Sequence, residues 1–200
     1  MKKINKILIY LISIVAICLG VVFFNKATIG RSLSSFLVLP SLLIPFFIKK
    51  IFKIKISDTF YFVYIIYMFL IEFLGCSFNL YNTTWWYDIF AHFLTGVLAS
   101  LISLVVLNWF KNYKENNIAF NAFFIICFNI FVSGFWEILE FFVYLTLKID
   151  VQHHLDTGVF DTMEDMLAAL LGGIIILVIY LINRNKKNNF FDKLIRIIVK

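Results

Sequence analysis

Six long blocks of apolar residues divide this 200-residue sequence and leave only short polar segments between them. The blocks cover residues 7–24, 32–48, 57–75, 88–110, 118–147 and 161–183. A helix needs about 20 such residues to cross a hydrocarbon core of about 30 Å. Spans of this kind must be helical, because lipid offers backbone groups no other hydrogen-bond partner. The sequence therefore predicts an all-α polytopic membrane bundle of about six transmembrane helices, forming a single integral membrane domain over residues 1–200.

Composition excludes an ordinary soluble domain, because 62% of the residues are hydrophobic and only 15% are charged. Soluble domains are near half apolar and a quarter charged. The first block imitates a secretory signal, but it is longer than a usual signal core and lacks a cleavage site, so it predicts an uncleaved helix. The cysteines, Cys18, Cys76 and Cys127, are scattered and odd in number, which indicates neither a disulfide framework nor a zinc knuckle.

The basic residues predict the orientation of the chain. With the N-terminus inside, 15 of the 18 Lys and Arg residues fall on the inner side, and only Lys26, Arg31 and Lys148 fall outside. Such an imbalance is what the positive-inside rule expects, so both termini are predicted to be cytoplasmic. The same clusters, set between apolar blocks, favour contact with membrane lipids over nucleic acid as the reason for the net charge of +6.

Three local features refine this bundle. Pro40 and Pro45 predict a kink in the second block. Trp85 and Trp86 are typical of an aromatic anchor at the outer interface. The tail 184–200 mixes apolar and basic residues and predicts an amphipathic helix, beginning near residue 190, on the cytoplasmic leaflet.

Ionisable residues inside the apolar blocks are the chemically informative ones, since each costs about 2.5–3.5 kcal/mol at a helix centre. The candidates among them are Glu72, Asp88, His92, Glu137, Glu140, Asp161, Glu164 and Asp165. The predicted orientation places all of them in the outer half of the membrane. Residues three and four apart share a helix face, so we expect these side chains to point into the bundle and toward one another.

The balance of charge in this layer predicts a cation or protons. Up to seven carboxylates and His92 lie there, and no Lys or Arg lies within the spans. Clustered carboxylates cannot all stay ionised in a low dielectric. A histidine with carboxylates suits Zn²⁺ or Mn²⁺, and carboxylates alone suit Mg²⁺. The predicted ligands are His92, Glu137, Glu140 and Asp165, with Glu137, Glu140 and Asp165 also catalytic and with Asp88, Asp161 and Glu72 as further candidates.

The same residues also allow structural roles. Asp161 and Glu164 have the spacing of a capping box, and Asp88 has the position of a helix cap. Glu72 is near enough to a helix end to reach interfacial water, and His92 fits a buried histidine with one hydrogen-bonded neighbour. The histidines and aspartates of the outer segment 150–156 are either solvated, or metal ligands, or a lid over the site.

Three strings carry a resemblance to a known group: WWYDIFAHFLTG (85–96), GFWEILEFF (134–142) and DTMEDMLAALLGG (161–173). They resemble bacterial inner-membrane proteins of the YjdF type, in the wider VanZ-like group, over roughly residues 57–183. The matches to the group's motifs D-x-x-x-H-F, W-E-x-x-E and D-T-x-x-D-M are Asp88 and His92, Glu137 and Glu140, and Asp161 and Asp165. Ala169 stands where VanZ itself usually has Asn, which places the chain nearer YjdF. The resemblance implies a shared fold and site, a location in the bacterial plasma membrane and a link to glycopeptide-antibiotic resistance, without a settled reaction.

Three functions remain open from the sequence. A divalent ion at the carboxylate and histidine cluster would support an enzyme acting on a lipid or lipid-linked substrate at the outer leaflet. The same carboxylates could relay protons or cations in a coupled transporter. A non-catalytic membrane scaffold or antibiotic-resistance accessory would use them for helix packing alone.

Overall fold

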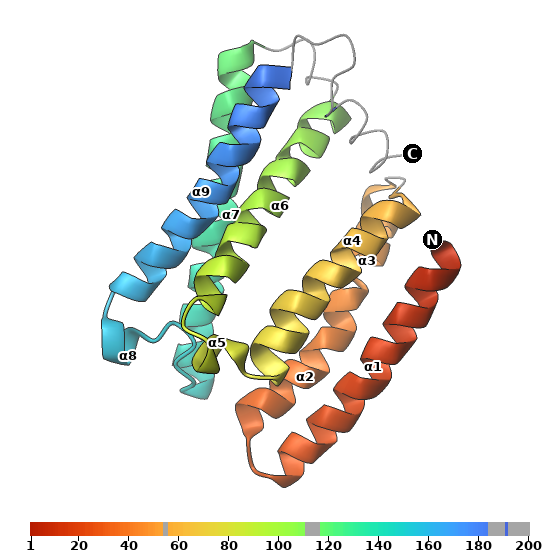
Figure 1. The fold of residues 1–200 in the computed structure, drawn as a ribbon, viewed down its shortest axis with the longest axis vertical. Coiled ribbons are helices and arrows are strands. Elements are labelled where there is room, and N and C mark those ends of the chain that lie inside the picture. The colour runs from red at the N-terminus through yellow and green to blue at the C-terminus, as the bar shows by residue number, and fades with distance from the viewer. Residues whose placement is uncertain (54–55, 111–116, 184–190, 192–200) are drawn as a thin grey trace. The chain divides into compact units, whose positions relative to one another are not determined.

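The computed structural model describes residues 1–53, 56–110, 117–183 and 191, and its described elements are all helices (Figure 1). Six of them, some interrupted, are long and apolar enough to cross a membrane: Lys2–Asn25, Ile29–Ile51, Asp58–Ser77, Tyr87–Trp109, Ile118–Leu147 and Phe160–Asn183. The prediction of an all-α chain with six such helices is therefore confirmed. The predicted amphipathic tail helix lies, apart from Phe191, outside the described residues.

The chain divides into two compact units, which we describe separately. Unit 1 comprises Met1–Tyr87 with Arg196–Lys200, and unit 2 comprises Asp88–Ile195. That residues 1–200 act as a single membrane domain stays a prediction.

In unit 1 the second apolar block is broken at Leu43, as its two prolines predict. Helix α2 (Ile29–Leu42) ends there and α3 (Ile44–Phe52) begins at the next residue. Pro40 lies inside α2, where its ring removes a backbone N–H donor. Pro45 lies in the first turn of α3, a position whose N–H needs no partner within the helix.

Several polar side chains of unit 1 donate to backbone carbonyls of a neighbouring helix. Ser32 on α2 donates to the carbonyl of Gly20 on α1 (Lys2–Asn25) at 2.8 Å. Tyr61 and Tyr64 on α4 (Asp58–Met68) donate to carbonyls near the end of α2 at 2.8 and 2.7 Å. These bonds lie beside an apolar core and satisfy the donors inside the protein, which lipid cannot do.

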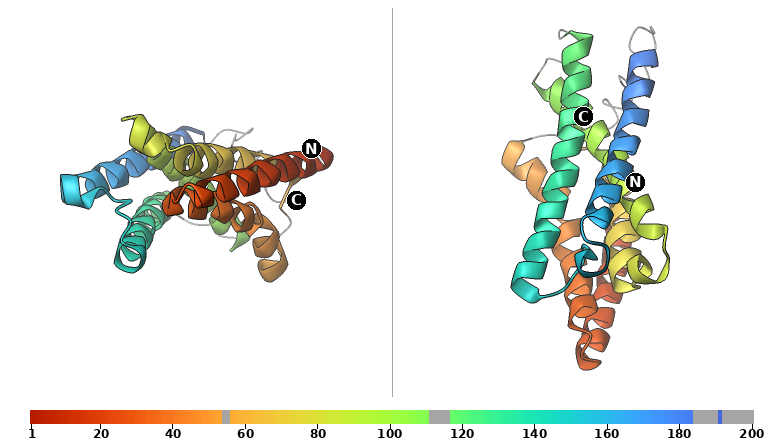
Figure 2. Two further views of the ribbon diagram at one scale, coloured as in Figure 1. Left: turned by 90° about the horizontal axis from the view of Figure 1, so that it is seen from below. Right: turned by 90° about the vertical axis from the view of Figure 1, so that its left-hand side faces the viewer.

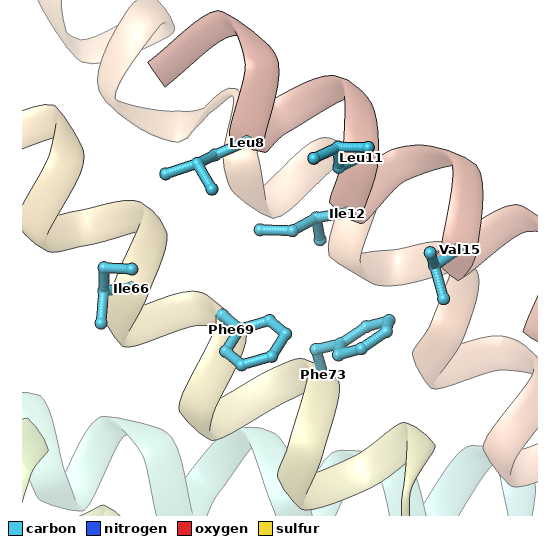
Figure 3. A pocket seen from close by; sticks show the side chains of 7 residues that line it. All are labelled: Leu8, Leu11, Ile12, Val15, Ile66, Phe69 and Phe73. Carbon is cyan, nitrogen blue, oxygen red and sulfur yellow. The ribbon is translucent and has the colours of Figure 1, made fainter. Parts of the chain in front are cut away.

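Helix α4 continues as a π-helix, η1 (Phe69–Ser77), and the chain then passes through the short α5 (Leu80–Thr83). The guanidinium of Arg31 closes the end of η1 by donating to the Ser77 carbonyl at 2.9 and 3.1 Å. Between α1 and the α4–η1 segment lies a groove, shown in Figure 3. Its lining is wholly apolar: Leu8, Leu11, Ile12, Val15, Ile66, Phe69 and Phe73.

Unit 2 is built from α6 (Tyr87–Trp109), α7 (Ile118–Leu147), the short α8 (His154–Thr157) and α9 (Phe160–Asn183). Helices α6 and α9 run in the same direction and α7 runs in the opposite one (Figures 1 and 2). The starts of α6 and α9 therefore lie at the same end of the unit as the end of α7.

Small residues let α6 and α9 approach closely. A Cβ atom added to Gly96 would overlap the backbone carbonyl of Ala169, and one added to Gly172 would overlap the carbonyl of Phe93. Close backbone approach of this kind is typical of small residues in membrane helix pairs. Small residues on both helices thus form their contact.

Asn129 on α7 joins all three long helices of unit 2. Its amide nitrogen lies 2.8 Å from the carbonyl of Gly96, 3.1 Å from the hydroxyl of Ser100 and 3.2 Å from the carbonyl of Ala169. Farther along, an apolar core that includes Leu104, Ile125 and Tyr180 fills the unit. These contacts form a three-helix frame, which holds the polar residues at the end of the unit where α6 and α9 start and α7 ends.

Candidate metal centre

Helix α6 presents Asp88 and His92 on one face. The helix begins at Tyr87, so Asp88 lies in its first turn and His92 lies one turn later. Residues four apart meet on a helix surface. The His92 Nε2 atom is 3.4 Å from Asp88 Oδ1, and the histidine side chain is only 8% exposed. Asp88 therefore does not act only as a helix cap, because its carboxylate also faces the imidazole.

Helix α9 adds a second buried carboxylate to the same nitrogen. Asp165 Oδ2 lies 3.7 Å from His92 Nε2, and its side chain is 4% exposed. One ligand atom each from Asp88, His92 and Asp165 can be chosen so that all three lie within 4.8 Å of one another. In a tetrahedral zinc site, with bonds of about 2.0–2.1 Å, two ligand atoms are about 3.4 Å apart. The distances of 3.4 and 3.7 Å from His92 Nε2 to the two carboxylate oxygens are close to this separation.

Glu137 on α7 faces the other nitrogen of the same ring. Its Oε1 atom lies 4.0 Å from His92 Nδ1, and its side chain is 6% exposed. Among the described residues this oxygen has no hydrogen-bond partner. A buried carboxylate oxygen without a partner is costly, so the geometry points to a proton, water or ion near it.

Gln152 is a residue of this end of the unit that the sequence did not single out. It lies between α7 and α8 and its side-chain amide is buried. The amide nitrogen donates to the Glu137 carbonyl at 3.0 Å and to Glu137 Oε2 at 3.2 Å, and it lies 3.4 Å from the Thr162 hydroxyl. A lone glutamine in a polar loop carries no pattern that marks it. Only the folded loop shows its role.

Glu140 lies three residues after Glu137 on α7 but makes a different contact. It is half-buried, and it accepts a hydrogen bond from Trp136 Nε1 one turn earlier at 2.8 Å. The structure groups His92 and Asp165 with Asp88 as possible metal ligands. The predicted ligand set with Glu137 and Glu140 stays a prediction.

The remaining candidates are placed as follows. Asp161 is half-buried one turn before Asp165, and its Oδ2 atom has no hydrogen-bond partner among the described residues. Glu164 is exposed. Helix α9 begins at Phe160, so Asp161 lies inside the first turn and not at the cap position that the capping-box hypothesis needs. Glu72 lies in η1 and belongs to unit 1.

The side chain of Asp150, in the segment before α8, is hydrogen-bonded to residues a few positions later in the chain. It accepts hydrogen bonds from the backbone N–H groups of His154 and Leu155 at 3.2 and 3.0 Å, and its Oδ1 atom lies 2.6 Å from His154 Nδ1. Partial burial raises the pKa of Asp150, but these hydrogen bonds outweigh it and hold the pKa below its ordinary value. These contacts favour a structural role for Asp150 and His154 over metal ligation.

The described part of unit 2 offers its acidic residues little compensating charge. Its long helices carry six carboxylates, whereas Lys148 is the only Lys or Arg within residues 88–110 and 117–183. Buried carboxylates beside one another must therefore bind protons or share a cation.

Comparison with known proteins places the chain. Residues 7–186 match the model of a family described as a predicted membrane protein (DUF2238). The chain belongs to this family. No curated protein and no solved structure matches it. The DUF2238 match includes α6, α7 and α9, so Asp88, His92, Glu137 and Asp165 all lie inside the region that defines the family. The protein is thus a multi-pass membrane protein with a buried Asp–His–Asp group.

Proposed function

We propose that this protein is a metal-dependent enzyme of the bacterial plasma membrane that acts on a lipid or lipid-linked substrate. The observation that carries the proposal is the group of Asp88, His92 and Asp165, whose ligand atoms lie within 4.8 Å of one another. Two of the three side chains are buried, and the described part of this unit, residues 88–110 and 117–183, holds one Lys and no Arg.

Charge and ligand type support a divalent ion there. Two ionised aspartates and a neutral imidazole carry a charge of about −2, which one divalent ion cancels. Imidazole nitrogen with carboxylate oxygen favours Zn²⁺ or Mn²⁺, whereas Mg²⁺ prefers oxygen ligands alone. We therefore expect Zn²⁺ or Mn²⁺ before Mg²⁺.

The chemistry follows from such an ion. A bound divalent metal polarises a phosphoryl or acyl oxygen, or turns a bound water into a hydroxide nucleophile. The Oδ2 atom of Asp161, which has no hydrogen-bond partner among the described residues, is a candidate for the group that accepts the proton of that water. The group lies near the ends of membrane-spanning helices, where the reactive part of a lipid or lipid-linked molecule can reach it.

The basic residues support a location in the outer half of the membrane with both termini in the cytoplasm, since 15 of 18 fall on the predicted inner side. The resemblance to YjdF-type and VanZ-like proteins agrees with a shared extracytoplasmic site. It also keeps a scaffold or antibiotic-resistance accessory as the alternative.

Transport coupled to protons or cations has weaker support. A buried polar line of Ser133, Asn129 and Asn121 leads along α7 away from Glu137. However, Ile125 interrupts that line, and the Asn129 amide is engaged in helix packing. The line therefore favours a structural frame over a conduction path.

The experiment compares wild-type protein with His92→Gln. Purified protein is incubated with Zn²⁺ or Mn²⁺, desalted and assayed for bound metal, and the lipids of producing cells are compared by mass spectrometry. We expect about one ion per wild-type chain, no ion in a folded His92→Gln variant, and a lipid or lipid-linked species whose level changes only with the wild type. Metal-free wild-type protein, or identical lipids in both strains, would contradict the proposal.

A further inference from the structure

Glu137 and Gln152 form a contact that reaches the candidate metal centre from the loop side. Gln152 donates to both the backbone carbonyl and the Oε2 atom of Glu137. One amide group therefore contacts both the backbone and the carboxylate of the same residue. This pair of contacts restricts the rotation of the Glu137 carboxylate.

The oxygen that Gln152 does not hold is the one that faces His92. Glu137 Oε1 is buried, has no hydrogen-bond partner among the described residues, and lies 4.0 Å from His92 Nδ1. Histidines that bind a metal through one nitrogen usually donate the other N–H to a carboxylate, which fixes the tautomer. His92 Nε2 faces Asp88 and Asp165, so its Nδ1 is the nitrogen left for this purpose.

We propose that Gln152 is a positioning residue of the metal centre: it holds Glu137 so that Oε1 accepts from His92 Nδ1–H and leaves Nε2 free to bind the ion. The inference rests on the proposed function, and it gives the loop between α7 and α8 a direct part in metal affinity. The simpler role for Gln152 is to fix the loop alone, in which case His92 would not respond to its loss.

The test uses Gln152→Leu, which removes the donor at similar volume, and Gln152→Asn, which keeps the amide one methylene shorter and serves if the leucine variant fails to fold. Thr157→Ala is the matched control, because Thr157 ends the adjacent α8, is exposed and donates to the His153 carbonyl, its one side-chain hydrogen bond among the described residues. The first measurement is the ¹⁵N spectrum of the imidazoles in metal-free protein at one fixed pH. The chain has three histidines, so His153→Gln and His154→Gln assign the His92 signals.

The second measurement is Zn²⁺ affinity by competition with a chelator. We expect His92 to be the Nδ1–H tautomer in wild type and a mixture in both Gln152 variants, with Zn²⁺ bound about 10–100-fold more weakly. Thr157→Ala should match wild type in both measurements. A wild-type tautomer together with wild-type affinity in the Gln152 variants would overturn the inference.

The two proposals fail in different ways. If wild-type protein binds no Zn²⁺, the proposed function fails, and the tautomer measurement alone then decides whether Gln152 positions Glu137. If wild type binds Zn²⁺ and the Gln152 variants bind it equally well with an unchanged tautomer, only the inference on Gln152 fails.

Discussion

Units 1 and 2 use polar side chains in different ways. In unit 1, Ser32, Tyr61 and Tyr64 each donate to a backbone carbonyl of a neighbouring helix. In unit 2, Asn129 does the same, but at one end of the unit carboxylates gather around His92, and one buried Glu137 oxygen has no hydrogen-bond partner in the described part of the chain. Satisfied donors are what helix packing in a membrane requires. The buried carboxylates of unit 2 also require protons or a cation, which helix packing does not supply. This difference distinguishes polar groups that serve packing from those that can serve chemistry.

The largest expected effect is on metal binding. Asp165→Asn should lose Zn²⁺ affinity by more than the roughly 10–100-fold that loss of an outer-shell partner causes. Glu164→Gln is the matched control, because Glu164 precedes Asp165 on the same helix and is exposed. Glu72→Gln tests unit 1 and should leave affinity unchanged. Metal analysis after equilibrium dialysis measures all three, and a Glu72 effect equal to that of Asp165 would erase the contrast between the units.

The next effect concerns the glycines at helix contacts. In unit 2 a Cβ on Gly96 would overlap the backbone of Ala169, which cannot move without shifting α9. In unit 1 a Cβ on Gly20 would meet the ring of Phe36 at 2.7 Å, and a half-exposed side chain can rotate away. We expect Gly96→Ala to lower stability by about 1–3 kcal/mol and Gly20→Ala by less. Thermal unfolding in detergent compares them, and equal losses would contradict the close α6–α9 contact.

A smaller effect is expected from the polar packing bonds. Interhelical hydrogen bonds in membrane proteins contribute about 0.6 kcal/mol on average and at most about 1.7. Asn129→Leu removes a group that contacts two other helices and should be near the upper value, while Tyr64→Phe in unit 1 should be near the average. Unfolding measurements should rank them in that order. Full Zn²⁺ binding by a folded Asn129→Leu variant would show that Asn129 serves packing alone.

The smallest effect concerns Asp150. Its pKa is held below the ordinary 3.8, so its contribution to loop stability is complete above that value and is lost as the pH falls through the lowered pKa. Asp150→Asn should therefore make the segment near α8 more sensitive to protease at neutral pH, with little change in the helices. A cleavage pattern identical to that of wild type would show that these hydrogen bonds do not order the loop.

Much of the fold could be predicted because apolar length and helix formation are tightly linked in a membrane. The fifth predicted span, 118–147, coincides with α7, and the prolines predicted a kink in the second block, which the structure interrupts at Leu43. The π-helix at Phe69–Ser77 could not be predicted, since it depends on how neighbouring helices accommodate one extra residue per turn.

The site was predictable only in part. Asp88 and His92 share a helix face by spacing alone, and Asp161 and Asp165 share one for the same reason. Glu140 has the same spacing logic as Glu137, yet the packing of α7 buries Glu137 and leaves Glu140 beside Trp136. Gln152 depends on the path of a loop, which no periodicity encodes.

The most direct test of the metal centre is electron spin echo envelope modulation of Mn²⁺ bound to the purified protein. A metal held by Asp88, His92 and Asp165 should show coupling to one histidine nitrogen, and that coupling should vanish in His92→Gln and persist in His153→Gln. Bound Mn²⁺ without nitrogen coupling, or coupling that survives His92→Gln, would contradict the account.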